Sequence, residues 1–371
     1  RHLKGDQDWP DQQGVWLQEL DTQQEKLVGQ RVQLTYGHAN NAVWTEGPHL
    51  YKINGKYLLM VAEGGTGFNH AITVHHSDSV FGPYVADMVN PVMTHRHLGE
   101  NYPVHSIGHA DLVQTQKGDW WSVMLGKRFV DGYTLLARET FLTPVVFEDQ
   151  RPVFNPGVGK VLLEQERPDL PWTPVKTAPA RDNFSASTLG QQWNMLRTPQ
   201  TRWYALENGK LSLELRPQTL SQLGNPSLLA RRIRHHQFSS SLRLDFEPGG
   251  QDERAGLVLY RSSACHYQFV KQQDSLVIIR TEQGEANVVA RTPYKTGPVI
   301  LKAEADGLDL QFSYGESEKN MISLGEKQSM SVISFEVAGG FNGPYVGMYA
   351  SGGEKASNDK AQFDWFEYQA K

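Results

Sequence analysis

A repeated segment is the feature of this chain that most restricts its fold. Residues 46–61 and residues 109–124 share one pattern, in which two apolar strands flank a turn that contains glycine. The segments align at an offset of 63 residues, the difference between positions 46 and 109, so Glu46 falls on His109. Short strands joined by such turns are typical of β-hairpins, and a repeat of this length is typical of one blade of a β-propeller.

Each repeat predicts about four short strands, and an incomplete unit precedes them. Two strands expected near the start of the chain resemble only the third and fourth strands of a blade, so the chain enters a blade midway. The expected strands cover residues 14–21 and 31–35 before the repeats, residues 49–53, 56–62, 71–75 and 84–85 in the first repeat, and residues 112–115, 119–125, 133–140 and 145–148 in the second.

Two and a half blades cannot close a propeller, which has four to eight blades and loses its exposed sheet edges by closing. We therefore expect that roughly 150 residues of propeller are missing before Arg1. An export signal would lie in that missing part, so the location stays open between the cytoplasm and the periplasm or exterior. The alternative is a two-sheet domain that only looks repetitive.

The character of the sequence changes after the repeats. Residues 164–180 contain four prolines and little apolar periodicity, which is typical of a linker. From residue 181 the chain contains longer strands in which polar and apolar side chains alternate, as in residues 238–246. Their number predicts a two-sheet sandwich. The sequence therefore predicts an all-β protein with part of a propeller at 1–163, a linker at 164–180 and a β-sandwich at 181–371.

Composition limits the partners of the chain. With 36 Lys and Arg against 41 Asp and Glu, the net charge of −5 does not indicate a nucleic-acid partner. No apolar run approaches the ~20 residues of a membrane span. The single cysteine, Cys265, excludes an internal disulfide, and the sequence has no zinc spacing, phosphate-binding loop or dinucleotide fingerprint. We therefore predict no nucleic-acid partner, no membrane partner and no required cofactor.

Glu46 and His109 stand where a propeller binds its ligands. The first strand of each blade lines the propeller axis, so the starts of these strands converge on one pocket. A carboxyl group and an imidazole that face one pocket suit acid–base chemistry or ligand binding. The alternative is that each is an ordinary solvated residue at the end of a strand.

Four motifs, taken in this order, resemble glycoside hydrolase family 43. The region after residue 181 resembles the concanavalin A-like C-terminal domain of the β-xylosidase branch of that family. The resemblance implies a five-bladed propeller, and an inverting exo-glycosidase that removes terminal β-D-xylosyl or α-L-arabinofuranosyl residues from xylan-derived oligosaccharides. The motifs are Trp-Thr-Glu-Gly-Pro-His-Leu-Tyr-Lys at 44–52, Ala-Glu-Gly-Gly-Thr-Gly at 62–67, Gly-His-Ala-Asp-Leu-Val at 108–113 and Arg-Glu-Thr-Phe at 138–141.

The resemblance also implies roles for five residues. Glu46 matches the general acid, which must hold a proton near neutral pH before it gives that proton to the leaving group. Arg138 matches an arginine that hydrogen-bonds sugar hydroxyls, and His109 matches a histidine beside which some relatives hold a hydrated calcium ion (Ca²⁺). Phe68 is placed either to stack on a sugar or to pack in the core. Phe341 is the candidate for a phenylalanine that closes the pocket around chain ends.

An inverting hydrolase also needs a general base about 6.5–9.5 Å from the acid. In the family this base and a second aspartate, which tunes the acid, come from blades that this sequence does not show. Asp6, Asp8 and Asp11 lie in a polar stretch without strand context, and we assign the base to none of them. The alternative function is a catalytically inactive, carbohydrate-binding propeller fragment. Because relatives often form dimers or tetramers, a homo-oligomer is an expectation by analogy.

Overall fold

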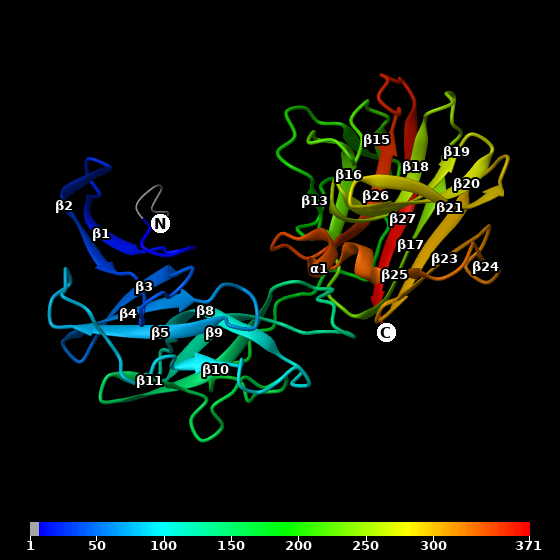
Figure 1. Cartoon of the computed structure of the whole chain (residues 1–371). Helices are drawn as coiled ribbons and strands as arrows, with labels where there is room; N and C mark the ends of the chain where they lie inside the picture. Colours follow the sequence, from blue (N-terminus) through cyan, green and yellow to red (C-terminus); the bar gives the residue numbers. More distant parts are fainter. Residues whose placement is uncertain (1–6) are drawn as a thin grey trace. The chain divides into compact units, whose positions relative to one another are not determined.

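The computed structural model describes residues 7–371, which form two compact units (Figure 1). The first unit contains the described residues up to 129 together with 138–172, and the second contains 130–137 together with 173–371. Strands dominate both units, so the predicted all-β class, with propeller-type blades before a sandwich, is confirmed. In the described part of the chain, no helix is long and apolar enough to cross a membrane.

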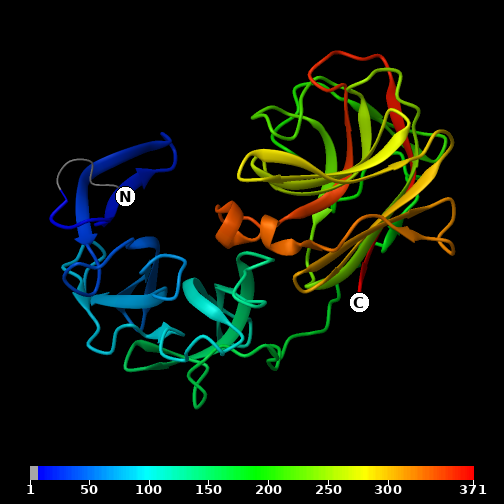
Figure 2. The ribbon, with the colours of Figure 1, turned by 45° about the vertical axis from the view of Figure 1, so that its right-hand side comes forward.

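The first unit contains three antiparallel sheets that follow one another in chain order (Figure 2). The two repeats found in the sequence form the second and third sheets, and the segment before them forms a separate hairpin. The strands are β1 (Val15–Asp21) and β2 (Lys26–Thr35); β3 (Glu46–Ile53), β4 (Lys56–Glu63), β5 (Ala71–Ser77), β6 (Val85–Ala86) and β7 (Met93–Thr94); and β8 (His105–Gln114), β9 (Trp120–Lys127), β10 (Glu139–Glu148) and β11 (Arg151–Phe154).

Turn chemistry and core packing explain why these repeats become sheets. Asn54 and Gly55, which join β3 to β4, have φ of 49° and 87°, and this left-handed backbone is what a tight hairpin turn requires. Apolar side chains of the two sheets, among them Met60, Ile72 and Ile107, pack in one buried cluster. The hairpin turn and the apolar pattern therefore indicate the same strands.

The two repeats also share an irregularity at the start of their first strands. The register of β3 against β4 shifts between Glu46 and His49, and that of β8 against β9 shifts between Gly108 and Asp111. Each shift inserts one extra residue into the first strand, which makes it a β-bulge. Because a bulge bends a strand and re-aims its side chains, Glu46 and His109 lie at equivalent, locally redirected positions.

The prediction of one strand in the second repeat was wrong. The sequence predicted strands at 133–140 and 145–148, whereas the chain forms a loop followed by the single strand β10. Residues 130–137 belong to the second unit, and Leu135 and Leu136 are buried in its core. The alternation of apolar residues there therefore serves the core of a different unit and not a blade strand.

The second unit is a sandwich of a nine-stranded and a seven-stranded sheet, both antiparallel (Figure 1). The nine-stranded sheet contains β12 (Arg181–Asp182), β14 (Tyr204–Glu207), β15 (Lys210–Glu214), β17 (Gln237–Asp245), β22 (Val299–Asp306), β23 (Asp309–Gly315), β24 (Ile322–Ser323), β25 (Gln328–Ser329) and β27 (Lys360–Ala370). The seven-stranded sheet contains β13 (Asn194–Met195), β16 (Ser227–Arg232), β18 (Arg254–Ser262), β19 (Cys265–Gln272), β20 (Ser275–Glu282), β21 (Glu285–Pro293) and β26 (Tyr345–Ser351).

A large apolar core belongs to this second unit. The alternation predicted for residues 238–246 is confirmed, since Phe238, Leu242 and Leu244 are fully buried while Arg243 lies on the more exposed face. Burying such side chains contributes roughly 1.5–3 kcal/mol each. The strand pattern therefore accounts directly for the packing of the sandwich.

The segment 130–137 is held in this unit by polar contacts as well as by its leucines. The backbone nitrogen and the hydroxyl of Thr134 each donate to the Glu336 carboxylate at 2.7 Å. The backbone nitrogen of Phe335 donates in turn to the carbonyl of Thr134 at 3.0 Å. Both partners belong to the short helix α1 (Phe335–Ala338), which follows the 3₁₀ turn Met330–Ile333.

Stability of the sandwich should depend on pH through His266, which is fully buried in β19. Burial lowers the pKa of His266 to about 4, although the carbonyl of Ser262 acts in the opposite direction. The folded state therefore binds fewer protons than the unfolded state below pH 6.5. The contribution of neutral His266 to the free energy of unfolding is fully present above pH 6.5 and is lost as the pH falls towards 4. The free energy of unfolding should therefore fall by roughly 2 kcal/mol between pH 7 and pH 5.

The variant His266→Gln keeps a side-chain donor but cannot titrate, so the free energy of unfolding should change less between pH 7 and pH 5 than in the parent. Urea unfolding at the two pH values, followed by tryptophan fluorescence, measures this difference. His97→Gln replaces an exposed histidine and should keep the parental pH dependence. An unchanged pH dependence in His266→Gln would contradict the assignment.

Candidate active site

A pocket of about 450 Å³ lies at the start of β3 in the first unit. Glu46 and His109, which the sequence repeat made equivalent, both line it. Glu46 is the one carboxylate among these lining residues, all of which lie in the described part of the chain. The pocket is lined by Gly14, Val15, Trp16, Arg31, Thr45, Glu46, Gly47, Pro48 and His109.

The imidazole of His109 packs against the backbone next to Glu46. Gly47 has φ of 56°, and a Cβ atom added there would lie 2.5 Å from His109 Nε2. Only glycine permits this approach, since real Cβ contacts are never so short. His109 itself has φ of 51°, a left-handed conformation that costs a non-glycine residue of order 1–3 kcal/mol. The bulges of β3 and β8 therefore bring the two candidate residues together at the cost of backbone strain.

His70 packs against the strand segment that carries His109. The sequence did not predict His70 as a site residue. Its Nδ1 lies 2.8 Å from the carbonyl oxygen of Ser106, and a Cβ atom added to Gly108 would lie 2.5 Å from its ring. Burial lowers the pKa of His70 to about 4, and the charges of His109 and Arg138 contribute in the same direction. His70 is therefore neutral at pH 7. A histidine just after a glycine-rich loop was the signal for it in the sequence.

Arg138 acts electrostatically on the same site. The residue is half-buried just before β10, and burial lowers its pKa while the Glu46 carboxylate raises it. A guanidinium remains charged at every physiological pH, and its planar fork suits two neighbouring hydroxyl groups. The structure thus places Glu46 and His109 in one pocket and Arg138 within electrostatic reach of Glu46, although Arg138 is not among the residues that line the pocket.

Two further predicted residues lie elsewhere. Phe68 is 41% exposed and packs edge-on against His105 and Phe129, with ring centroids 5.1 and 5.6 Å away, and it does not line the pocket. Phe341 is 59% exposed and belongs to the second unit, in the loop between α1 and β26. The sugar-contacting roles of both phenylalanines stay predictions.

Trp16 and Arg31 form a wall of the pocket that the sequence reasoning did not predict. Trp16 comes from β1 and Arg31 from β2, and the guanidinium lies 5.5 Å from the centroid of the indole. Tyr36 makes an edge-to-face contact with Trp16, with ring centroids 6.0 Å apart. The sequence signal for this wall was an aromatic residue at the start of a strand with alternating polar and apolar side chains. Aromatic rings offer a flat apolar face to a ligand.

The early aspartates do not line this pocket, and the residues that do line it are a poor set of calcium ligands. Asp6 lies outside the described residues, and Asp8 and Asp11 are not among the residues that line the pocket. Calcium takes six to eight oxygen ligands, whereas His109 offers a ring nitrogen beside the single carboxylate of Glu46. Within residues 7–371 no cluster of three or more His, Cys, Asp or Glu side chains could hold a metal ion. These residues do not by themselves fit calcium.

Comparison with known proteins matches both parts of the chain. Residues 2–152 match Glycosyl hydrolases family 43, and residues 181–369 match the Beta xylosidase C-terminal Concanavalin A-like domain. These matches define the class of protein as a glycoside hydrolase. The chain belongs to glycoside hydrolase family 43.

Two curated relatives match most of the chain. A xylosidase/arabinosidase of Butyrivibrio fibrisolvens is 36% identical over 360 residues, which cover 95% of this chain and 69% of that protein. The non-reducing end α-L-arabinofuranosidase of Bacteroides ovatus is 37% identical over 335 residues, which cover 87% of this chain and 62% of that protein. The chain thus spans about two thirds of the length of each of these relatives.

Solved structures show the same architecture. The GH43B protein of the Bacteroides ovatus xyloglucan locus superposes with a TM-score of 0.91 at 34% identity, covering 98% of this chain and 73% of that one. The xylan β-1,4-xylosidase of Bacillus halodurans superposes with a TM-score of 0.89 at 32% identity, covering 96% and 70%.

The Gly47–His109 contact predicts a marked difference between two glycine substitutions. Gly47→Ala adds both left-handed strain and a clash with the imidazole, whereas Gly55→Ala adds strain alone, since nothing lies within 4 Å of a Cβ atom there. Gly55→Ala should cost roughly 1–2 kcal/mol of unfolding free energy, and Gly47→Ala clearly more. The Gly47 variant alone should shift the imidazole NMR signals of His109. Equal effects of the two substitutions would contradict this packing.

Proposed function

We propose that the protein is an inverting exo-glycosidase that hydrolyses terminal β-D-xylosyl or α-L-arabinofuranosyl residues of xylan-derived oligosaccharides. The observation that carries the proposal is the grouping of Glu46, His109 and Arg138 at one site in a chain that belongs to family 43. The names of the relatives, which include a xylosidase/arabinosidase and a xylosidase, support this substrate class.

In this mechanism Glu46 is the general acid. Its carboxyl group gives a proton to the glycosidic oxygen as the bond to the anomeric carbon breaks, and positive charge spreads over the ring carbon and oxygen. A carboxylate base removes a proton from a water molecule, which attacks the anomeric carbon from the opposite face and inverts it. Arg138 holds sugar hydroxyls with its planar fork, and His109 packs behind the acid.

The base in this proposal is a carboxylate other than Glu46. Among the described residues that line the pocket, Glu46 has the only carboxyl group, so none of the others can serve. The same observation favours the second candidate function, a carbohydrate-binding protein without turnover. The two functions differ in whether a bound oligosaccharide is cleaved.

Replacement of the acid tests the first function directly. Glu46→Gln should lower kcat on xylo-oligosaccharides by about 10²–10⁴-fold, because the amide cannot protonate the leaving group. Hydrolysis of a 2,4-dinitrophenyl glycoside should fall much less, since that leaving group needs no proton. Steady-state kinetics on both substrates measure the difference.

A Glu46→Gln variant whose activity on oligosaccharides stays within a few-fold of the parent would remove Glu46 as the acid. If the parent binds xylo-oligosaccharides in calorimetry but never cleaves them, the binding function replaces the enzymatic one.

Arg138 should contribute to sugar binding through its shape as well as its charge. Arg138→Lys keeps the charge but loses the fork, so KM should rise about 10-fold or more, as expected for a lost charged hydrogen bond of roughly 1.5–3 kcal/mol. Arg128 offers a control near the same strand end, because its guanidinium forms an ion pair with Glu139, whereas that of Arg138 interacts electrostatically with Glu46. Arg128→Lys should leave KM within about 2-fold of the parent; similar KM values in both variants would exclude a sugar contact by Arg138.

A further inference from the structure

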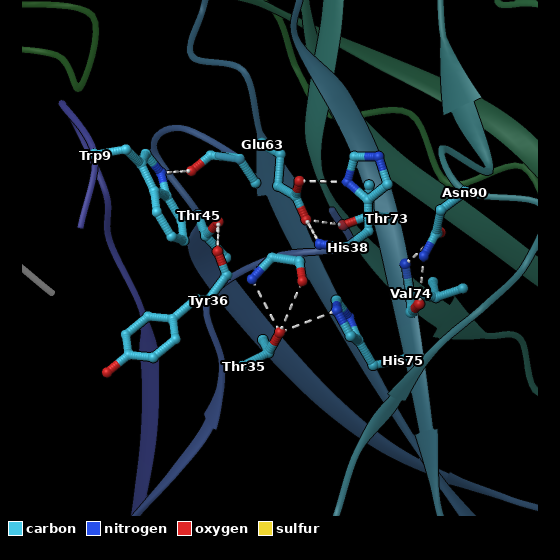
Figure 3. A network of polar contacts seen from close by, with 12 residues as sticks. Trp9, Thr35, Tyr36, His38, Thr45, Glu63, Thr73, Val74, His75 and Asn90 are labelled. Carbon is cyan, nitrogen blue, oxygen red and sulfur yellow. Dashed lines mark hydrogen bonds and ion pairs between the residues drawn. The ribbon is translucent and has the colours of Figure 1, made fainter. Parts of the chain in front are cut away.

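Glu63, the last residue of β4, is a buried carboxylate with an unusually complete set of donors (Figure 3). The residue is only 3% exposed. Oε1 accepts hydrogen bonds from the backbone nitrogen of His38 at 3.0 Å and from the hydroxyl of Thr73 at 2.6 Å. Oε2 lies 2.5 Å from His38 Nδ1, within hydrogen-bond distance. Both oxygens of Glu63 are therefore engaged.

Packing alone does not explain a charge at this position. A buried carboxylate carries a desolvation cost of several kcal/mol, and an apolar residue would fill the same space without it. Burial acts to raise the pKa of Glu63, but the hydrogen bonds from His38 and Thr73 outweigh it and hold the pKa below its usual value. Glu63 is therefore ionised at neutral pH, and the charge serves to hold its donors.

The donors place Glu63 under the loop that leads to the candidate acid. Residues 36–45 connect β2 to β3, and their ends are joined by the hydrogen bond from Thr45 Oγ1 to the carbonyl of Tyr36 at 3.0 Å. The backbone nitrogen of Gly64, the neighbour of Glu63, donates to the carbonyl of Val43 at 2.9 Å. The next residue after this loop is Glu46, so the loop determines where β3 begins.

The first turn of the loop packs closely against its surroundings. A Cβ atom added to Gly37 would lie 2.5 Å from Ala42 Cβ and 3.3 Å from Glu63 Oε2. Thr35 Oγ1 accepts from the backbone nitrogen of Gly37 at 2.9 Å and lies 3.1 Å from Nε2 of His75, which is buried in β5 (Figure 3). Figure 3 shows these contacts as one network between the loop and the sheet.

We propose that Glu63 is a positioning residue, which with His38 fixes the loop 36–45 and so sets the place of the Glu46 carboxyl group at the bulge of β3. Glu63 does not line the pocket and acts through the loop. This role rests on the proposed function, in which Glu46 is the general acid. A loss of Glu63 should therefore impair protonation of the leaving group more than binding of the sugar.

A second carboxylate with a buried side chain, Asp87, directly follows β6 of the same sheet and provides a matched control. The Asp87 side chain is 4% exposed, as is that of Glu63, and it lies 2.9 Å from His76 Nε2 and 2.9 Å from Arg151 Nε. Its contacts join β5 to β11 and not to the loop 36–45. Asp87→Asn therefore reproduces the loss of a buried paired charge without releasing the loop.

The test compares Glu63→Gln with Asp87→Asn in the protein. Both variants should lower the Tm. Only Glu63→Gln should speed backbone hydrogen exchange in residues 37–46 by about 10-fold or more and lower kcat on xylo-oligosaccharides by about 10-fold or more with KM within about 3-fold. Hydrolysis of a 2,4-dinitrophenyl glycoside by Glu63→Gln should fall clearly less. The proposal would be overturned if Glu63→Gln had the same hydrogen-exchange rates and the same kinetic constants as Asp87→Asn.

A pair of substitutions at the partially exposed His38 covers the case in which Glu63→Gln fails to fold. The side-chain amide nitrogen of asparagine can occupy the place of the imidazole Nδ1, so His38→Asn should keep near-parental exchange and kcat. His38→Leu removes the donor and should reproduce the effects of Glu63→Gln. Parental behaviour of His38→Leu would also overturn the proposal. If Glu46→Gln keeps full activity, the proposed function fails, while the exchange data still decide whether Glu63 and His38 hold the loop.

Discussion

The close approach of the His109 imidazole to the backbone of Gly47 is the contact on which the candidate site depends. It requires a glycine with positive φ in β3 and a strained histidine in β8, and each lies where a bulge redirects the first strand of its sheet. Strain of this kind persists only where the surrounding structure holds it, here through neighbouring sheets that share a core. A carboxyl group and an imidazole thus face one pocket because two copies of the same strand irregularity lie side by side.

Two buried polar side chains, His70 and Glu63, stabilise the segments that carry the candidate residues. His70 is held neutral beneath the strand that carries His109, and Glu63 is held charged beneath the loop that leads to Glu46. Each would cost stability if it lost its partners, since an unsatisfied group in a poorly solvated site is more costly than an apolar one. Two buried polar groups of this kind, His70 and Glu63, therefore lie next to the segments that carry the candidate residues.

Local signals predicted much of the fold, and long-range packing decided the rest. The Asn54-Gly55 turn and the alternation at 238–246 depend on neighbouring residues, so both could be recognised in the sequence. The segment 130–137 could not, because Leu135 and Leu136 pack in the core of the second unit while the strands on either side belong to the first. An apolar pattern indicates that a segment is buried, but it does not indicate in which core.

The sequence by itself determined the repeat, the all-β class, and the candidates Glu46, His109 and Arg138, because each is carried by local spacing or by a family motif. Only the tertiary structure decided that Glu46 and His109 line one pocket near Arg138, that Trp16 and Arg31 form a wall of that pocket, and that Glu63 contacts His38 in the loop before Glu46. These juxtapositions join residues from different strands and loops. Their distances depend on strand register, bulges and sheet packing, which a linear pattern does not contain.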